Sequence, residues 1–522
     1  MIKHNISAVA VLVLGIVFFA LAQVDTAWVR RWDGPAHCSD WAQGLALDSS
    51  GNVLVTGVTC TDTISGHYDF ITLKYSPDGE LLWARQYGTP DALDRPYAIA
   101  CDREGNVYVT GEAELGNAKL VTIAYSPSGQ LLWVRSFEFT YPGRDIGVDR
   151  QGNILVCSYV RRVNEDWITI KYRPNGDTAW VRFYDTGYEY DQARALAIGP
   201  GDEVCVGGVC YINPPGGDYL ILKYDSTGKQ LWVARYNGPQ TGNDHLEDIA
   251  MDDEGNVVVT GWGDKGYGTD PDYLTIKYNY KGETCWVRRF NGSANGRDVA
   301  TAVKVDNDGS VFVTGYSLGE GTDDDYITIK YSPKGGVCWV RRYNGPANGL
   351  DQAFAIAVDQ QGNAYVTGGV RISLPHTAAC LTIKYNPDGD TAWTAAYSAP
   401  AGKVVYGQAV IVDSRGCVYV AGIYDYDILT IKYVQGGGVE EQRTLDGRKL
   451  TFAAKPNPFK GLTAISIPLS AQGRTKVGIF DVSGRVVKTL VDGLLPAGVY
   501  SFVWDGTDIN GRRAPAGVYM IL

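Results

Sequence analysis

Aromatic and acidic side chains gather in three segments of the chain that read as connections between strands. The segment WGDKGYGTDPD holds Trp262, Asp264, Tyr267, Asp270 and Asp272, a second segment holds Asp323 and Asp324, and a third holds Tyr211 and Asp218. Aromatic rings beside carboxylates suit the binding of sugars or peptides. A pair of carboxylates about 5–10 Å apart, one of them with a raised pKa, would instead suit cleavage of a glycosidic bond. The plain alternative is an ordinary solvated loop.

A second acidic set occupies one position of an internal repeat. Its members are Asp40, Asp94, Asp191, Asp244, Asp298 and Asp351, and each stands at the start of a short apolar segment. If those segments surround a common axis, the carboxylates ring one mouth of a central channel, where a cation or a polar ligand could bind. An Asp at a strand start also caps the preceding turn through its side chain. We favour this capping role and expect no metal site.

The residue types that other chemistries need are scarce or lack the required spacing. Only five histidines occur, His4, His37, His67, His245 and His376. No HExxH, no P-loop and no GxSxG in a nucleophile context is present, so we expect no catalytic residues and no cofactor. Lys and Arg number 47 against 58 Asp and Glu, which gives a formal charge of −11. This balance disfavours nucleic acid as a partner, because phosphate binding needs clustered positive charge.

Three markers that recur in the same phase show that the chain is a tandem repeat. The first is a tryptophan, at Trp28, Trp83, Trp133, Trp180, Trp232, Trp286, Trp339 and Trp393. The second is a TIKY-like segment that ends at Tyr75, Tyr125, Tyr172, Tyr224, Tyr278, Tyr331, Tyr385 and Tyr433. The third is a turn followed by a strand, as in GNVYVTG at 105–111. Each of the eight repeats reads as four short strands, A to D, which is the pattern of a β-propeller blade.

The strands at which the repeats begin and end predict a closed ring. The first strand of each repeat is rich in Ala and Gly, as expected where strands converge on an axis. The chain enters the repeats with a fourth strand, from Trp28 to Trp32, and the eighth repeat stops after its third strand, at Tyr433. The N-terminal strand can therefore complete the last blade and remove a free sheet edge. We predict an all-β fold with an eight-bladed propeller over residues 24–433. Seven blades is the alternative, if the divergent third repeat packs irregularly.

The repeat motifs resemble a known family. The pattern AIAVD, GNVYVTG, DYxTIKY and WVRRY resembles the bacterial beta-propeller repeat (SBBP) proteins over residues 24–433. The resemblance implies an extracytoplasmic propeller, and it brings no shared catalytic residues with it.

A different pattern follows a linker at residues 434–450. Residues 451–522 carry PNPF (456–459), FDVSGR (480–485), WDGTDINGR (504–512) and AGVYMIL (516–522). Their alternation and turns predict a small β-sandwich. They resemble the immunoglobulin-like domain of the flagellar hook-capping protein (FlgD-like) and the related C-terminal sorting domain of type IX secretion. Those families usually continue for one more strand, so we expect this domain to lack its last strand.

The N-terminus is typical of an export signal. Lys3 precedes an uninterrupted apolar run, and Ala20-Leu21-Ala22 fits a cleavage site, which predicts a signal peptide at residues 1–22. A retained membrane anchor is the alternative. We expect a secreted or cell-surface, outer-membrane-associated protein with no membrane span after cleavage.

The ten cysteines would then lie in an oxidising compartment. Five of them, Cys101, Cys157, Cys205, Cys210 and Cys380, occupy apolar positions of predicted strands, so buried small hydrophobic residues are the simpler interpretation. Cys38 with Cys60, and Cys205 with Cys210, are the two candidate disulfides.

These observations predict an exported, non-catalytic binding or adhesion module. Its ligand would be a glycan, a peptide or a protein, and its C-terminal domain would serve in sorting or anchoring through the export machinery. The short AB and CD turns share one face of the ring, and the variable BC and DA loops share the other, where we expect binding. A lyase or glycosidase that uses the loop carboxylates is one alternative. A structural spacer or protein-interaction scaffold is another.

Overall fold

Every regular element that the structure describes is a β-strand. The computed structural model describes residues 24–62, 67–89, 93–114, 118–138, 140–161, 165–187, 191–211, 216–238, 242–264, 270–373, 377–435, 453–455, 463–469, 473–481, 486–496, 498–514 and 519–521. The predicted signal peptide and Tyr267 therefore lie outside the described residues, as does the predicted linker from residue 436 on. Its first two residues, 434 and 435, instead belong to the last strand of the propeller. Residues Val24–Gln435 form one compact unit, and the strands after residue 436 form another. Among the described residues, no helix has the length and hydropathy needed to cross a membrane.

Eight four-stranded antiparallel sheets make up the first unit, so the eight-bladed propeller is confirmed. The A strands are β2 (Trp41–Leu47), β6 (Arg95–Cys101), β10 (Asp145–Val148), β14 (Gln192–Ile198), β18 (Asp244–Met251), β22 (Asp298–Val305), β26 (Gln352–Val358) and β30 (Val405–Val412). The B strands are β3 (Val53–Cys60), β7 (Val107–Glu114), β11 (Ile154–Arg161), β15 (Val204–Tyr211), β19 (Val257–Gly263), β23 (Val311–Leu318), β27 (Ala364–Ser373) and β31 (Val418–Tyr424). The C strands are β4 (Tyr68–Tyr75), β8 (Ala118–Tyr125), β12 (Glu165–Tyr172), β16 (Gly217–Tyr224), β20 (Asp272–Tyr278), β24 (Asp324–Tyr331), β28 (Thr377–Tyr385) and β32 (Asp427–Gln435). The D strands are β5 (Leu81–Tyr87), β9 (Leu131–Phe137), β13 (Thr178–Tyr184), β17 (Gln230–Tyr236), β21 (Thr284–Phe290), β25 (Val337–Tyr343), β29 (Thr391–Ser398) and, from the N-terminus, β1 (Val24–Trp32).

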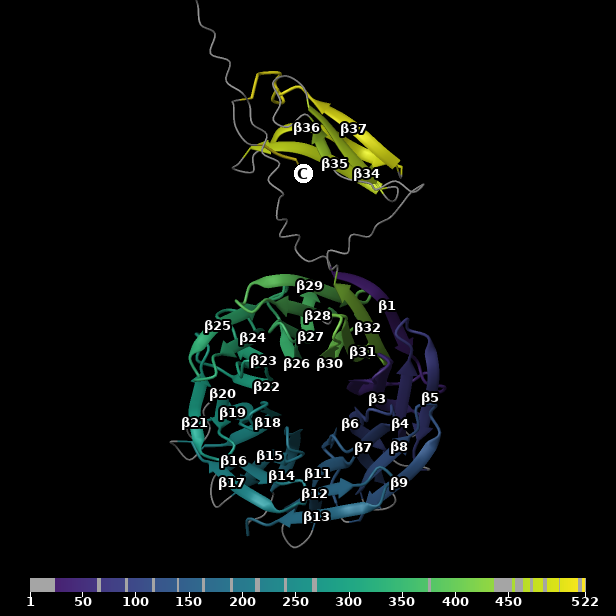
Figure 1. The fold of residues 1–522 in the computed structure, drawn as a ribbon, viewed down its shortest axis with the longest axis vertical. Coiled ribbons are helices and arrows are strands. Elements are labelled where there is room, and N and C mark those ends of the chain that lie inside the picture. The colour runs from purple at the N-terminus through teal and green to yellow at the C-terminus, as the bar shows by residue number, and fades with distance from the viewer. Residues whose placement is uncertain are drawn as a thin grey trace, which may run out of the picture. The chain divides into compact units, whose positions relative to one another are not determined.

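The strands are arranged radially around one axis. Figure 1 shows the A strands on the inside of the ring and the D strands on the outside. Each A strand contacts the A strand of the next blade, and β30 contacts β2, so the inner ring is closed. Neighbouring blades bury their B and C strands against one another, and these strands supply most of the fully buried residues. The core is therefore a set of inter-blade layers.

The N-terminal strand closes the last blade, as the phase of the repeat predicts. β1 pairs antiparallel with β32, with Val24 opposite Gln435 and Trp32 opposite Ile428. Figure 1 shows the first strand, in purple, beside the green strands of the last blade. This pairing covers the outer edge of β32, which would otherwise offer unpaired backbone groups to another chain.

The divergent third blade keeps its place in the ring. Its A strand, β10, has only four residues. The preceding segment is nevertheless fixed, because Tyr141 N donates to Tyr159 O and Arg144 N donates to Cys157 O. These bonds continue the contact between the first and second strands, so the seven-bladed alternative is wrong.

One of the two candidate disulfides is formed. Cys38 is bonded to Cys60, with a Cα–Cα distance of 5.6 Å. Cys205 and Cys210 are free, buried thiols, so that pairing is wrong. The two side chains lie on one strand, five residues apart, and therefore point to opposite faces of the sheet.

The described residues of the second unit form two three-stranded sheets. One has the order β33 (Ala453–Lys455), β34 (Thr463–Leu469) and β37 (Gly498–Trp504), and the other has the order β36 (Val486–Leu495), β35 (Gly473–Asp481) and β38 (Tyr519–Ile521). Ile465, Ile479 and Trp504 are among its buried residues. The predicted small β-sandwich is consistent with this arrangement.

Candidate functional site

The repeated Trp–Arg pairs on the D strands connect each blade to the next. Between the fifth and sixth blades, Trp286 Nε1 donates to Pro333 O at 3.1 Å and Arg288 Nε donates to Gly335 O at 2.6 Å. The Arg288 guanidinium also lies 5.7 Å from the centre of the Trp286 ring. The same pair of bonds starts from Trp28 and Arg30, Trp83 and Arg85, Trp133 and Arg135, Trp180 and Arg182, and Trp339 and Arg341. These residues are structural, as their recurrence predicts.

A glutamine replaces this connection where the last blade has no CD turn. Trp393 Nε1 donates to Gln435 Oε1 at 3.4 Å, and Lys384 Nζ donates to the same oxygen. The Gln435 amide in turn donates to Tyr365 Oη at 2.8 Å and Gly416 O at 2.6 Å. The Gln435 side chain thus accepts the hydrogen bonds that backbone carbonyls of the CD turn accept in the other blades.

Gln435→Ala should therefore lower the stability of the propeller by about 2 kcal/mol, because it leaves the donors of half-buried Lys384 and buried Trp393 without an acceptor. We expect Gln435→Glu to recover part of this loss, since Glu accepts the same two bonds. Chemical denaturation of the three proteins checks both statements. Equal stability of Gln435→Ala and the parent would contradict this role.

The six repeated aspartates cap the loops at the start of their A strands. Asp244 accepts from Gly238 N at 2.7 Å and lies 3.1 Å from Arg289 Nη2. Asp351 accepts from Gly345 N and Arg371 N in the same manner. All six carboxylates are buried, with Asp40, Asp94, Asp191, Asp244, Asp298 and Asp351 at most 1% exposed. They do not ring an open mouth of the axis. Among the described residues, no group of three or more His, Cys, Asp or Glu side chains is placed to hold a metal ion.

Burial of these carboxylates predicts a pH dependence of stability. It raises the pKa of Asp191, Asp244 and Asp351 to about 6. A folded-state pKa above the unfolded value of about 3.9 favours folding at low pH, and this stabilisation is lost as the pH rises through about 6. We expect the propeller to melt several degrees higher at pH 5 than at pH 8.

Melting curves between pH 4 and pH 8 check this expectation. Asp191→Asn, whose side chain stays neutral, should show a smaller difference between pH 5 and pH 8 than the parent. A melting temperature that is constant or rises over this interval would contradict it.

Most of the loop carboxylates that the sequence singled out are also buried. Asp324 is 1% exposed and accepts from Arg297 Nη2 at 2.5 Å, and Asp218 is 3% exposed and pairs with Arg235. Asp264 is 6% exposed and accepts from Asn243 N, and Asp272 is 2% exposed. These four side chains make folding contacts and are not presented at an open surface. Asp270 and Asp323 are exposed, and Tyr211 is half-buried.

Trp262 belongs to a polar cluster at the axis, which we call the axial cluster: Arg194, His245, Glu247 and Trp262. The Trp262 ring stacks on the His245 ring, with centroids 4.9 Å apart and planes 12° apart. Glu247 accepts from Trp262 Nε1 at 3.3 Å, lies 2.9 Å from His245 Nδ1, and pairs with Arg194 of the preceding blade at 3.3 Å. All four side chains are half-buried.

Electrostatics keep the acid of this cluster ionised. Burial would raise the pKa of Glu247, but the hydrogen bond and charge of His245, with the charge of Arg194, outweigh burial and lower it. The cluster therefore presents a fixed carboxylate between an imidazole, a guanidinium and an indole.

A second cluster, the Tyr–Arg cluster, joins the second and third blades: Tyr97, Glu112, Arg144 and Tyr159. The Arg144 guanidinium lies 5.0 Å from the Tyr97 ring centre and 5.8 Å from the Tyr159 ring centre. Tyr97 Oη donates to Glu112 at 3.3 Å. An arginine between two aromatic rings is a cation–π arrangement that fixes all three side chains.

The A-strand members of both clusters, Tyr97, Arg194, His245 and Glu247, belong to a larger set of positions at which the blades differ. After each capping Asp, the first and third residues of the A strand are half-buried, except Val299, which is buried at 9% exposure, and the second residue is buried. These variable positions hold Trp41 and Gln43, Arg95 and Tyr97, Gln192 and Arg194, His245 and Glu247, Val299 and Thr301, and Gln352 and Phe354. Tyr406 takes the same place in the last blade, 6.5 Å from the Phe354 ring. We call this set the axial ring. Apart from Trp262, which contacts it, the sequence analysis missed these residues, although their variation between repeats was the available signal.

Comparisons with known proteins match both parts of the chain. The Beta-propeller repeat (SBBP) family model matches residues 82–113, and the FlgD Ig-like domain model matches residues 458–521. The chain is 45% identical over 51 residues to the basal-body rod modification protein FlgD of Escherichia coli K12, which covers 10% of this chain and 22% of that protein. It is 51% identical over 43 residues to FlgD of Salmonella typhimurium, covering 8% and 18%. The chain thus spans about a fifth of the length of these relatives.

Several solved structures with low identity to the chain also match it. The WD40 domain of Neurospora crassa Pan2 is 9% identical with a TM-score of 0.41, covering 80% of this chain and 97% of that chain. A PL25 ulvan lyase is 12% identical with a TM-score of 0.40, covering 71% and 96%. The propeller domain of the Trilobed protease from Pyrococcus furiosus is 10% identical with a TM-score of 0.40, covering 66% and 95%. Likenesses at this level carry no functional inference. The chain combines an eight-bladed propeller, whose residues 82–113 match the Beta-propeller repeat model, with a C-terminal segment that matches the FlgD Ig-like domain model.

Proposed function

We propose that this chain is an exported, non-catalytic binding module that takes a glycan or peptide on the axial ring. The observation that carries the proposal is the contrast between repeated and variable residues. The repeated polar groups are engaged in contacts within and between blades, as in the bonds from Trp286 and Arg288. The variable residues gather around the axis, at the end of the A strands that the BC and DA loops share. A ligand lacks eight-fold symmetry, so residues that recognise it must differ between blades.

The composition of the axial ring favours a polar ligand with apolar faces. Trp41, Tyr97 and Phe354 offer rings, and sugars and peptide side chains stack on such rings. Arg194 and Glu247 offer opposite charges at fixed positions, since they pair at 3.3 Å. Side chains already held by neighbours lose little conformational freedom on binding, which favours affinity.

Export is supported by the disulfide and by the predicted signal peptide. Disulfides persist in oxidising compartments and are rare in the cytosol. The Cys38–Cys60 bond lies in the first blade, close to the start of the repeats. For the C-terminal domain we propose a sorting or anchoring role, in line with its predicted resemblance to type IX sorting domains.

Binding to glycan and peptide arrays tests the proposal. The full chain without its signal peptide should bind a restricted set of probes, and Trp262→Ala should weaken the best interaction at least tenfold. Tyr280→Ala is the matched control, because Tyr280 is an exposed aromatic residue on a CD turn, with 56% exposure. We expect the control to bind like the parent, and we expect the bound probe to be recovered unchanged. Equal binding by Trp262→Ala and the parent would refute the axial ring as the site.

A further inference from the structure

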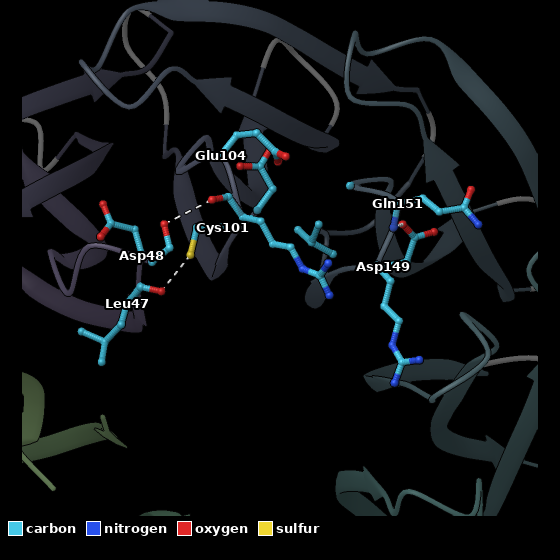
Figure 2. A pocket seen from close by; sticks show the side chains of 12 residues that line it. Leu47, Asp48, Cys101, Glu104, Asp149 and Gln151 are labelled. Carbon is cyan, nitrogen blue, oxygen red and sulfur yellow. Dashed lines mark hydrogen bonds between the residues drawn. The ribbon is translucent and has the colours of Figure 1, made fainter. Parts of the chain in front are cut away.

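A pocket of about 440 Å³ lies at the other end of the A strands, between the AB turns of the first three blades. Figure 2 shows Leu47, Asp48, Cys101 and Glu104 on one side of it, with Asp149 and Gln151 on the opposite side. Leu47, Cys101 and Val148 are the last residues of β2, β6 and β10, and they supply its apolar lining. None of the residues that the sequence analysis proposed as ligand contacts lines this pocket.

The three aspartates of the pocket already have partners inside their own blades. Asp48 pairs with Lys74 at 2.9 Å, and Asp149 pairs with Lys171 at 2.7 Å. Asp102 accepts from Tyr108 Oη at 2.8 Å and from Asn106 Nδ2 at 2.7 Å. At 6–8% exposure they offer little to a ligand.

Two arginines of the pocket, unlike these aspartates, have exposed side chains. Arg103 and Arg150 are exposed, and no ion pair joins either guanidinium to a described residue. The same turn position in the other blades holds Ser49, Pro200, Asp253, Asn307, Gln360 and Ser414. Arginine thus occupies this position only in two adjacent blades, and both of these residues line the pocket.

The rim that carries these arginines is fixed by bonds between blades. Ser49 Oγ donates to Arg103 O at 3.2 Å, and Arg150 N donates to Asp202 Oδ1 at 3.0 Å. Gln151 Nε2 also donates to Asp202 at 3.2 Å. The backbone positions of Arg103 and Arg150 are therefore set before any ligand arrives.

We propose that this pocket binds a sugar-sized ligand that bears one oxyanion group, a carboxylate, sulfate or phosphate. Arginine forks recognise such groups through paired N–H donors. Glu104, exposed on the same rim, accepts hydrogen bonds from hydroxyl groups and disfavours a ligand with several negative charges. The volume lies in the range of small-molecule sites, about 300–1,000 Å³. This site is separate from the axial ring, so a negative test of one binding site leaves the proposal for the other unaffected.

Calorimetric titration of the full chain with four probes tests the proposal. The probes are glucuronate, glucose 6-sulfate, glucose 6-phosphate and neutral glucose, with inorganic phosphate as a charge control. We expect at least one acidic sugar to bind ten times more tightly than both glucose and inorganic phosphate, and the preferred probe identifies the oxyanion. Binding of glucose as tight as that of the acidic sugars, or no binding of any acidic sugar at 10 mM, would overturn the proposal.

Two double variants separate the pocket from the overall charge of the protein. Arg103→Ala/Arg150→Ala should weaken the preferred acidic sugar at least tenfold. Arg173→Ala/Lys334→Ala removes the same charge from exposed CD turns and should change the affinity less than twofold. Because all four side chains are exposed, both double variants should melt like the parent. An equal loss of affinity in the two would overturn the site. If Trp262→Ala still binds the acidic sugar, that result would support a pocket that is independent of the axial ring.

Discussion

Trp28→Ala is expected to open the ring between the last and first blades and to cost about 3–5 kcal/mol of stability. Trp28 is 7% exposed, packs against Tyr75 and Tyr419, and donates to Pro77 O at 3.0 Å. It is the buried anchor of β1, which joins the last blade through strand pairing with β32. Loss of β1 would expose the β32 edge, so the variant should also aggregate as its concentration rises.

Hydrogen exchange and light scattering check this expectation. Exchange should quicken in β1 and β32 before it quickens in β20 and β24. Trp286→Ala, which removes the same contact inside the ring, should quicken exchange near the fifth and sixth blades instead. Thr26→Ala, at an exposed position of β1, should leave the protein unchanged. Uniform exchange in Trp28→Ala, or no loss of stability, would contradict closure by the N-terminal strand.

Lys74→Ala is expected to cost about 3 kcal/mol, because it leaves a buried carboxylate without its charge partner. Lys74 is 3% exposed and lies 2.9 Å from Asp48 Oδ2. Burial would raise the pKa of Asp48, but hydrogen bonds from Asn52 and Lys74 outweigh it and lower the pKa. Without Lys74 the pKa of Asp48 should rise, and the stability of the variant should depend more strongly on pH around pH 4–6. Chemical denaturation at pH 5 and pH 8 measures both effects.

The second blade provides a natural control for this prediction. Ala124 stands there in place of the lysine, and Tyr108, directly opposite it on β7, donates its hydroxyl to Asp102 at 2.8 Å. In the first blade, Leu54 is opposite Lys74. Lys74→Ala/Leu54→Tyr copies the second blade, so it should be more stable than Lys74→Ala alone. A double variant less stable than Lys74→Ala would show that the hydroxyl cannot replace the ammonium group.

The blades and their closure were predictable because each packing contact recurs with the repeat. Trp28 and Tyr433 stand at the ends of an incomplete repeat, and only pairing of β1 with β32 completes the last sheet. The third blade was harder to predict, since its A strand is short and the bonds of Tyr141 and Arg144 replace part of it. Those bonds join backbone groups, which a side-chain pattern does not reveal.

The burial of the loop carboxylates could not be predicted from local sequence. Asp218 pairs with Arg235 on the neighbouring D strand, and Asp324 pairs with Arg297 in the loop before β22. Such pairs depend on how loops fold back on the strands. The Cys38–Cys60 disulfide likewise depended on distances in space. The axial ring was accessible in principle, through the positions at which otherwise similar repeats differ.

The most direct test of the proposed function is hydrogen exchange of the full chain with and without its best array ligand. Binding on the axial ring should slow exchange in the first halves of β6, β14 and β18, around Tyr97, Arg194 and Glu247, and should leave the D strands unchanged. Trp262→Ala should lose this protection at the same ligand concentration. Protection confined to the D strands or to the C-terminal unit, with none at the A strands, would contradict a binding module that works through its axis.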